Sequence, residues 1–347
     1  MRAVVLHGVG DVRVEDVPEP RIEEPADALV RVVAAGVCGS DLSVLRGLSP
    51  LPRPIRSGHE FIGIVEEVGS AVRGLRPGQF VLAPFSTADG TCRHCRRGVS
   101  MCCESARLFG EFGPDGSALD GGQAEFVRVP LAATTLLAAP DRPPAELLPA
   151  LLALTDVMST GHEAALHAGV GLGDAVVVVG DGAVGQCAIA ASRRLGAERI
   201  VVMSRHPERQ RLARSHGATD VVESRGERGA AEVADLLDGG SGHVIEAVGS
   251  LESIRQAIGC TRPGGRIGYV GLPWNVELPL FELFERNIAL SGGGANVRTV
   301  LPELLDDVLD GKLDPGRVFD ASYPLDDAAA AFHDMNARRR TKALLRP

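Results

Sequence analysis

The sequence predicts an α/β protein of two domains, on three observations. Its 347 residues exceed the usual size of one domain, about 150 residues, and suit two domains with a core each. Residues 1–150 contain short apolar runs separated by Gly and Pro, such as 29–33, 61–68 and 124–129, and this pattern is typical of β-structure. From residue 150 onward, apolar strands alternate with helix-like stretches, which predicts a doubly wound parallel sheet.

The elements of the second region can be assigned in order. A helix-like run at 147–168 precedes a strand at 176–180, and four pairs of a helix followed by a strand continue the alternation. The pairs are 183–195 with 199–203, 207–216 with 219–222, 229–237 with 243–247, and 251–261 with 266–270. A final segment contains a helix at 300–310, an extended stretch at 317–325 and a helix at 326–336.

Composition excludes several classes of partner. The formal net charge is −9 and no basic stripe is present, which argues against nucleic acid. The densest basic run, Arg338-Arg339-Arg340, reads as a solvated helix end. No run of about 18 apolar residues predicts a membrane span. The first residues are interrupted too soon for a signal peptide, so we expect a cytoplasmic protein.

A glycine pattern predicts a dinucleotide site. The sequence VVVVGDGAVG at 176–185 fits G-x-G-x-x-G with Gly180, Gly182 and Gly185. It follows a strand and opens a helix, which is the context that the motif requires. The glycines allow a tight turn, close approach of a pyrophosphate and close helix–strand packing. The alternative is a glycine turn in a domain that binds no nucleotide.

The end of the next strand distinguishes between cofactors. NAD enzymes usually place Asp or Glu there to bind the ribose 2′-hydroxyl. This chain has Ser204 and Arg205 instead, with Arg209 one turn later. Arginine pairs with a 2′-phosphate that a carboxylate would repel, so the sequence favours NADP(H). The alternative is that Arg205 is an ordinary surface residue and that NAD is used.

Two short sequence motifs predict a catalytic metal site. Cys38 lies in Gly-Val-Cys-Gly-Ser-Asp, and His59 opens a stretch that fits G-H-E-x-x-G-x-V-x-x-V-G. Thiolate and imidazole are zinc ligands, and a catalytic zinc takes three protein groups and leaves one position open. Four further cysteines crowd into residues 92–103, which in a cytosolic chain indicates metal rather than disulfides.

Together these motifs resemble the zinc-containing medium-chain dehydrogenase/reductase (alcohol dehydrogenase) family, over almost the whole chain. The resemblance implies a GroES-like, β-rich catalytic domain formed by residues 1–149 and completed by a return segment, 291–347. A Rossmann dinucleotide-binding domain at 150–290 would split it in sequence, with a zinc in the cleft between the two domains. The family also pairs through its dinucleotide domain, which implies a homodimer or homotetramer.

The third ligand of the catalytic zinc follows from the resemblance. In the family it lies just before the dinucleotide fold, where this chain has Asp156, as in bacterial secondary-alcohol dehydrogenases and some formaldehyde dehydrogenases. A carboxylate oxygen is a competent zinc ligand; the alternative is a helix N-cap. Glu60 is either a transient extra ligand or an anchor. Asp41 is either the carboxylate that orients His59 or a helix cap.

The implied reaction is hydride transfer between a nicotinamide and a small or medium alcohol, aldehyde or ketone. Zinc polarises the substrate oxygen and lowers the pKa of the alcohol. Ser40 stands where the family has its proton-relay hydroxyl, but Ser43 replaces the histidine of many members and cannot store a proton near neutral pH. Apolar walls are expected from Phe85, Phe109 and Tyr269, each of which could equally be a core aromatic.

The cysteine cluster matches the family's structural zinc with one change. Asp89 occupies the first cysteine position, and the other three fall on Cys92, Cys95 and Cys103. We expect an occupied site, with Cys102 or His94 as substitute ligands; the alternative is a metal-free lobe. Two further cysteines, Cys187 and Cys260, are interpreted as packing residues. The remaining residues that the resemblance places against the dinucleotide are Ala183, Val184, Val248, Val270 and Gly271.

Two alternative functions follow from the same motifs. One is an NAD(H)-linked dehydrogenase of polyols or of a biosynthetic intermediate. The other is a nucleotide-binding protein without catalysis. Relatives of the second kind lack the zinc ligands, so the presence of Cys38 and His59 counts against it.

Overall fold

The computed structural model describes residues 1–347, and they form two compact units. The first unit contains Met1–Asp156 and Asn296–Pro347, and the second contains Val157–Ala295. Both boundaries lie a few residues beyond the expected ones at 149/150 and 290/291. The first boundary lies later because helix α3 (Leu148–Leu154) packs on the strands of the first unit. Asp156, which follows α3, therefore belongs to that unit.

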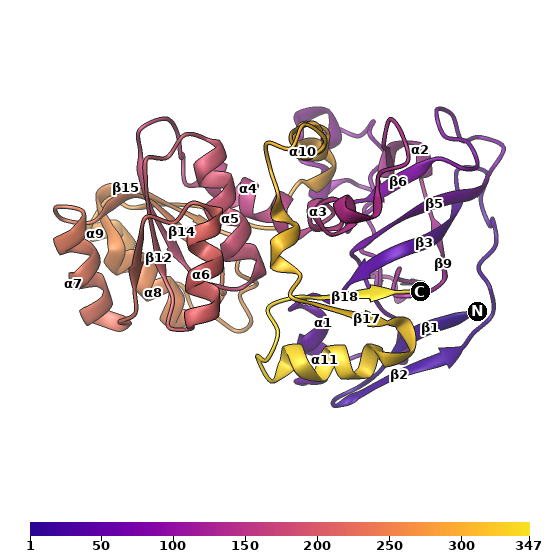
Figure 1. Ribbon diagram of the computed structural model, residues 1–347, viewed down its shortest axis with the longest axis horizontal. Helices are drawn as coiled ribbons and strands as arrows, with labels where there is room; N and C mark the ends of the chain where they lie inside the picture. The colour runs from indigo at the N-terminus through magenta and orange to yellow at the C-terminus, as the bar shows by residue number, and fades with distance from the viewer. The chain divides into compact units, whose positions relative to one another are not determined.

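The first unit is built on mainly antiparallel sheets (Figure 1). A small sheet has the order β2-β1-β4, and the main sheet has the order β10-β6-β5-β3-β18-β17, with β9 also paired to β3. A two-stranded ribbon, β7-β8, lies apart from them. The bounds are β1 Arg2–Gly8, β2 Asp11–Asp16, β3 Ala28–Gly36, β4 Ile55–Arg56, β5 Phe61–Val68, β6 Phe80–Ala83, β7 Glu111–Phe112, β8 Ala118–Leu119, β9 Phe126–Val129, β10 Leu137–Ala138, β17 Ala321–Pro324 and β18 Ala343–Arg346.

The C-terminal strand completes the main sheet. Strand β18 runs antiparallel to β3, with Leu344 opposite Gly36 and Leu345 opposite Ala35, and parallel to β17. The last residues therefore lie beside the strand that leads to Cys38. The helices of this unit are α1 Asp41–Leu45, α2 Ala132–Thr135, α3, α10 Val297–Leu309 and α11 Ala328–Asn336, with 3-10 turns at Cys95–Arg97, Ser100–Cys102, Ala145–Leu147, Pro315–Val318 and Leu325–Asp327.

The second unit is a parallel sheet of six strands in the order β13-β12-β11-β14-β15-β16. Helices α4, α5 and α6 pack together, as do α7 and α8, and Figure 1 shows the two groups on opposite faces of the sheet. The bounds are α4 Val157–His167, β11 Ala175–Val179, α5 Ala183–Arg194, β12 Arg199–Met203, α6 Pro207–His216, β13 Asp220–Val222, α7 Gly226–Leu236, β14 Ser241–Glu246, α8 Leu251–Cys260, β15 Thr261–Tyr269, α9 Leu280–Glu285 and β16 Ala289–Gly292.

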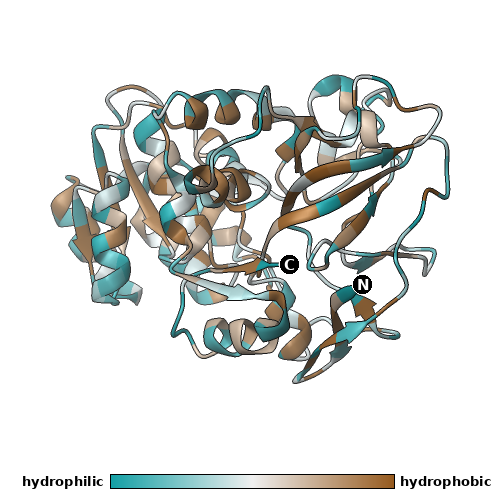
Figure 2. Ribbon diagram, turned by 45° about the vertical axis from the view of Figure 1, so that its right-hand side comes forward, coloured by the Kyte–Doolittle hydropathy of each residue, from teal (hydrophilic) through white to brown (hydrophobic).

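Burial explains why these segments form strands. The run Val176–Val179 is buried because helices cover both faces of a doubly wound sheet. In Figure 2 the strands of this sheet are predominantly hydrophobic, whereas the helices carry hydrophilic residues as well. Strands of the first unit alternate buried and more exposed positions, as along Ala28–Arg31 in β3. None of the helices has the length and apolar character needed to cross a bilayer.

One expected element is wrong. The continuous helix at 147–168 is a 3-10 turn followed by α3 and α4, with the interruption at Thr155 and Asp156. The break coincides with the boundary between the two units, so tertiary packing ends a pattern that is helical in sequence.

The strand order determines where a ligand can bind. The chain moves outward from β11 through β12 to β13, and then returns to the other side of β11 with β14. Open α/β sheets bind their ligands at such a reversal, so a ligand is expected at the carboxyl ends of β11 and β14.

Candidate functional site

Four side chains of the first unit converge on one point. They are Cys38, which follows β3, His59 and Glu60, which precede β5, and Asp156, which follows α3. Their candidate ligand atoms all lie within 4.8 Å of one another. Three of the four side chains are almost completely buried, and Cys38 is half-buried. Residues far apart in sequence are thus brought together, as expected for Cys38, His59 and Asp156.

The spacing of these atoms suits a zinc ion. Asp156 Oδ2 lies 3.4 Å from Cys38 Sγ and 3.4 Å from His59 Nε2. Ligands at about 2.0–2.3 Å from a tetrahedral zinc stand about 3.3–3.8 Å apart. The three groups therefore have the chemistry and the separation of one zinc site.

Electrostatics favour a charged carboxylate in this cluster. Burial alone would raise the pKa of Asp156, but the hydrogen bond and the charge of His59 outweigh it and hold that pKa well below its usual range. Burial, followed by the charge of Asp156, raises the pKa of the Cys38 thiol. A cation is needed to hold the thiolate form, and binding of a metal there would release the thiol proton.

Asp41 and Gln123 support the two N-terminal ligands. Asp41 Oδ2 accepts hydrogen bonds from the Cys38 backbone N–H at 2.9 Å and from Gln123 Nε2 at 3.0 Å, while its Oδ1 lies 3.6 Å from His59 Nδ1. Gln123 also donates to the Gly36 carbonyl at 2.8 Å. Gly58 has φ +102°, and a Cβ there would lie 2.3 Å from Gln123 Cγ, so only glycine fits before His59.

Glu60 is paired with a buried lysine, Lys342, that no sequence pattern marked. Lys342 Nζ lies 2.7 Å from Glu60 Oε1 and donates to the Val37 carbonyl at 3.2 Å. The two side chains are 1% and 0% exposed. Burial alone would lower the pKa of Lys342, but the charge of Glu60 raises it above its ordinary value. Glu60 Oε2 has no hydrogen-bond partner.

The expected relay and pocket residues are distributed unevenly. Ser40 is half-buried directly before α1, and Ser43 is buried within it. Phe85 meets His59 edge-on at 6.3 Å between ring centroids. Phe109 is fully buried against Phe61 at 5.0 Å and is a core aromatic rather than a pocket wall. Tyr269 lines a mainly apolar cavity of about 170 Å³ within the second unit.

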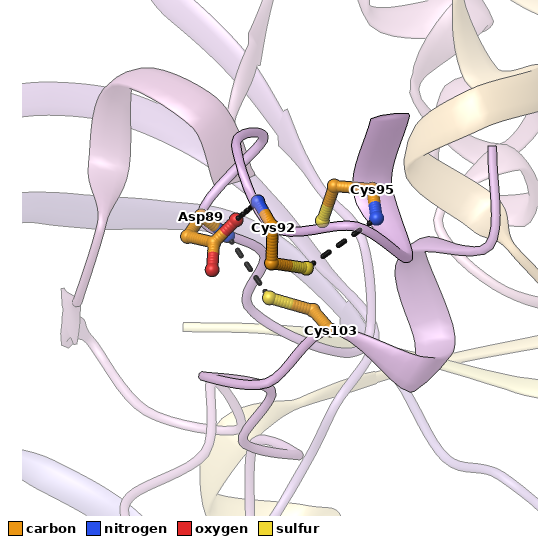
Figure 3. A group of neighbouring side chains, drawn as sticks. All are labelled: Asp89, Cys92, Cys95 and Cys103. Atoms are coloured by element: carbon orange, nitrogen blue, oxygen red, sulfur yellow. Dashed lines mark hydrogen bonds between the residues drawn. The ribbon is translucent and has the colours of Figure 1, made fainter. Parts of the chain in front are cut away.

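A second cluster contains Asp89, Cys92, Cys95 and Cys103, whose ligand atoms also lie within 4.8 Å of one another (Figure 3). Asp89 Oδ1 accepts backbone hydrogen bonds from Thr91 at 2.7 Å and Cys92 at 2.8 Å, and these hold the pKa of Asp89 well below its usual range. Cys92 Sγ accepts from the Cys95 N–H at 3.4 Å, which lowers the pKa of Cys92. Neither Cys102 nor His94 belongs to this group.

The loop that carries this cluster is fastened to α10. The Met101 N–H donates to Asn296 Oδ1 at 3.2 Å, and Thr299 Oγ1 donates to the Gly98 carbonyl at 3.0 Å. Asn296 is the residue at which the chain re-enters the first unit. The cysteine loop therefore secures the point of re-entry.

In the second unit the glycine turn lies between β11 and α5. Gly180 has φ +117°, and a Cβ at Gly185 would lie 2.0 Å from the Gly180 carbonyl oxygen, so both positions require glycine. A Cβ at Gly182 would meet no protein atom within 4 Å. Packing does not demand glycine at Gly182, and the open space suits the approach of a pyrophosphate to the start of α5.

Acidic and basic side chains both lie just beyond the ends of β11, β12 and β13. Ser204 is buried and donates to Asp181 Oδ2 at 2.7 Å, while Arg209 Nη1 pairs with Asp181 Oδ1 at 2.9 Å. Arg205 is exposed, as is Arg225 at the start of α7, just after β13. Sequence patterns marked neither Asp181, which occupies a variable position of the motif, nor Arg225. The other expected contacts, Ala183, Val184, Val248, Val270 and Gly271, lie at the start of α5 or after β14 and β15.

Comparison with known proteins identifies the family. The model for the alcohol dehydrogenase GroES-like domain matches residues 24–141, and that for zinc-binding dehydrogenases matches residues 183–310. Zinc-type alcohol dehydrogenase B of Aspergillus flavus is 34% identical, over 100% of this chain and 81% of its own length. The chain belongs to the zinc-dependent medium-chain alcohol dehydrogenase family. The resemblance of its motifs to that family is thereby confirmed, as is the GroES-like plus Rossmann fold class.

Two solved structures support the assignment to this alcohol dehydrogenase family. Alcohol dehydrogenase TADH from Thermus sp. ATN1 superimposes with a TM-score of 0.90 at 35% identity, covering 100% of this chain and 99% of that one. A Sinorhizobium meliloti 1021 protein described as a zinc-binding dehydrogenase and bound to NADP gives a TM-score of 0.82 at 29% identity, covering 100% and 99%.

The Lys342–Glu60 pair generates a prediction. Lys342→Met leaves the Glu60 carboxylate buried without its partner, so the free energy of unfolding should fall by about 3–5 kcal/mol, measured by urea denaturation. The double variant Lys342→Met/Glu60→Gln removes both charges and should recover most of the loss. Lys312→Met breaks an exposed pair of the same 2.7 Å length and should leave the unfolding midpoint unchanged. A double variant no more stable than Lys342→Met would contradict the pairing.

Proposed function

We propose that the chain is a zinc-dependent alcohol dehydrogenase. It transfers a hydride between a nicotinamide dinucleotide and a small or medium alcohol, aldehyde or ketone. The observation that carries the proposal is the buried convergence of Cys38, His59 and Asp156, at zinc-ligand spacing, in a member of this family. A binding protein without catalysis would have no use for so many buried, ionisable groups at one point.

In this proposal Cys38, His59 and Asp156 hold the catalytic zinc. When bound, the zinc supplies a Lewis acid that polarises the substrate oxygen and lowers the pKa of the alcohol. The nicotinamide supplies the hydride donor or acceptor. Asp41 holds the Cys38 loop and lies against His59 Nδ1, which leaves His59 Nε2 directed at Asp156 and the metal position.

The remaining site residues have supporting roles. Lys342 binds Glu60 through Oε1, and Oε2 has no hydrogen-bond partner. One carboxylate oxygen of Glu60 also lies within the group of candidate ligand atoms, so Glu60 is an anchor that can also offer a further ligand atom. Ser40 places a hydroxyl two residues after Cys38 for proton transfer from the alcohol. Phe85 packs perpendicular to the His59 ring and limits its contact with water.

Asp89, Cys92, Cys95 and Cys103 would hold a second, structural zinc. One carboxylate and three thiolates carry the same total charge as the usual four thiolates. Backbone N–H groups occupy Asp89 Oδ1 and two of the sulfur atoms, as polar neighbours orient the ligands of other metal sites. Cys102 and His94 have no part in this site.

Metal content tests both sites at once. We expect two zinc ions per chain in the wild type and one in Asp156→Asn. Alcohol turnover of Asp156→Asn should fall more than about 100-fold, because loss of a direct ligand should cost more than loss of a group that orients a ligand. Asp89→Asn is the matched control, since it should lose the other zinc and keep most of the activity. Elemental analysis and turnover of a panel of alcohols provide the measurements. An Asp156→Asn protein that keeps both ions and full turnover would contradict the proposal.

For the cofactor, we propose NADP(H) in preference to NAD(H). Support comes from the absence of an acid at the end of β12 and from the exposed positive charges of Arg205 and Arg225 after β12 and β13. A 2′-phosphate carries close to two negative charges near neutral pH. A related dehydrogenase with NADP bound adds to this support.

Arg205→Ala should therefore lower the ratio of kcat/KM for NADPH over NADH about tenfold, the equivalent of one lost charge-assisted contact. Arg211→Ala removes another exposed arginine of the same region, one paired with Glu208, and should leave the ratio unchanged. Steady-state kinetics with both cofactors measures it. Equal ratios in the wild type and Arg205→Ala would overturn the preference.

We also propose that two copies of the chain pair through the second unit. Strand β16 is the edge of the parallel sheet, and the neighbouring helix α9 exposes Leu280, Phe281 and Phe284 at 68%, 69% and 76%. Large apolar side chains that are exposed together beside the free edge of a sheet are typical of an interface.

Light scattering should accordingly give at least twice the mass of one chain for the wild type. Phe284→Glu should shift the protein toward the monomer, because a buried interface does not tolerate an unpaired charge. Leu172→Glu, at a single apolar residue that is 90% exposed in the same unit, is the control and should not change the mass. A wild type that is monomeric at all accessible concentrations would exclude this pairing.

A further inference from the structure

The glycine turn contains an acid. Asp181 lies between Gly180 and Gly182, in the loop where a dinucleotide's pyrophosphate is expected. Its side chain is buried, and both carboxylate oxygens are used: Oδ2 accepts from the Ser204 hydroxyl at 2.7 Å, and Oδ1 pairs with Arg209 Nη1 at 2.9 Å. The glycine turn is thereby linked to the end of β12 and to α6.

The position of this carboxylate bears on the choice of cofactor. In dinucleotide folds the acid that binds the ribose 2′-hydroxyl stands at the end of the second strand, about 20 residues after the glycine turn. Ser204 occupies that place here, and its hydroxyl is in direct contact with Asp181. The sequence lacks an acid at the strand end, yet the structure supplies one there from the turn.

Asp181 also changes the charge available for a 2′-phosphate. It neutralises Arg209 through the ion pair, and both partners of that pair are largely buried. The exposed arginines Arg205 and Arg225 remain, while Glu223, an exposed acid after β13, accepts from Gln210 at 2.9 Å. The strand ends therefore combine groups that attract a phosphate with a carboxylate that repels it and can accept a hydroxyl.

We propose that Asp181 is a specificity-determining residue that keeps the site open to NAD(H) beside NADP(H). The carboxylate favours a free 2′-hydroxyl and opposes a 2′-phosphate, so it reduces the preference that Arg205 and Arg225 create. This inference rests on the proposed use of a nicotinamide dinucleotide. It does not depend on which of the two cofactors the wild type prefers, since it concerns the change in preference.

A purely bracing role for Asp181 has a different signature. Asp181→Asn and Arg209→Gln both break the same ion pair. If the pair only braced the turn, both variants would weaken all nucleotides alike, or would move any preference in the same direction. If the charge of Asp181 matters, Asp181→Asn frees Arg209 and removes a negative charge, whereas Arg209→Gln leaves Asp181 without compensation. The two variants then move the preference in opposite directions.

The experiment measures binding of 5′-AMP and 2′,5′-ADP to the full chain by calorimetry, because these probes differ only in the 2′-phosphate. In Asp181→Asn the ratio of affinities for 2′,5′-ADP over 5′-AMP should rise about tenfold, since juxtaposed like charges are costly. In Arg209→Gln it should fall. The kcat/KM ratio for NADPH over NADH should follow the same order.

Asp220→Asn is the matched control. It removes the carboxylate of another arginine pair in the same sheet, with Arg199 at 3.0 Å, where β12 and β13 begin rather than end. The affinity ratio should stay at the wild-type value in this variant. If Asp181→Asn does not fold, Asp181→Ser replaces it with the same expected rise.

An unchanged ratio in the Asp181 variant, or a shift of both variants in one direction, overturns the proposal. These outcomes are separate from a failure of the proposed NADP(H) preference, which appears as an unchanged ratio in Arg205→Ala. A chain that binds neither probe would contradict the use of a dinucleotide itself, before any question of specificity arises.

Discussion

The need to compensate buried charge governs the first unit. Each ion removed from water costs several kcal/mol unless partners replace its hydration, and Glu60, Asp156 and the Cys38 thiol share one buried point. Lys342 and His59 supply positive charge, and the zinc expected there would add more. No short stretch of chain could provide these groups. They come from a strand end, a loop, a helix end and the C-terminal segment, and the antiparallel sheet holds these parts together.

The second unit meets the opposite requirement, since it must leave positive charge available to a ligand at its strand ends. Its core is apolar, and the polar groups considered above lie just beyond the carboxyl ends of β11, β12 and β13. There the chain pairs one arginine, Arg209, internally and leaves Arg205 and Arg225 exposed. How much positive charge a ligand meets at this edge depends on that division rather than on the number of arginines.

Sequence patterns predicted the parts of the structure that local chemistry dictates. Alternation of strands and helices gave the parallel sheet, and the phrases around Cys38 and His59 pointed to the metal cluster in which they lie. The break between α3 and α4 was not predicted, because packing of α3 on the first unit decides it. Lys342 was overlooked beside the basic run 338–340, since nothing local distinguishes a buried lysine from an exposed one.

Asp181 was overlooked for a related reason. The motif fixes its glycines by backbone geometry and treats the residue between the first two as variable, so its side chain carries no information at that level. Only the approach of Ser204 and Arg209 in space gives the carboxylate a role. The sequence is right that no acid occupies the end of β12, and the structure brings one beside it from the glycine turn.

The placement of Lys342 directly before the closing strand β18 has a consequence for biosynthesis. A ribosome releases the chain from its N-terminus, so Cys38 and His59 emerge early, while the partner of Glu60 lies 282 residues further on. The main sheet cannot insert β18 between β3 and β17 until residues 343–346 have been made. The charge balance of the centre therefore depends on a segment that is synthesised late. A chain that stops short of Lys342 is left with an uncompensated acid in its interior.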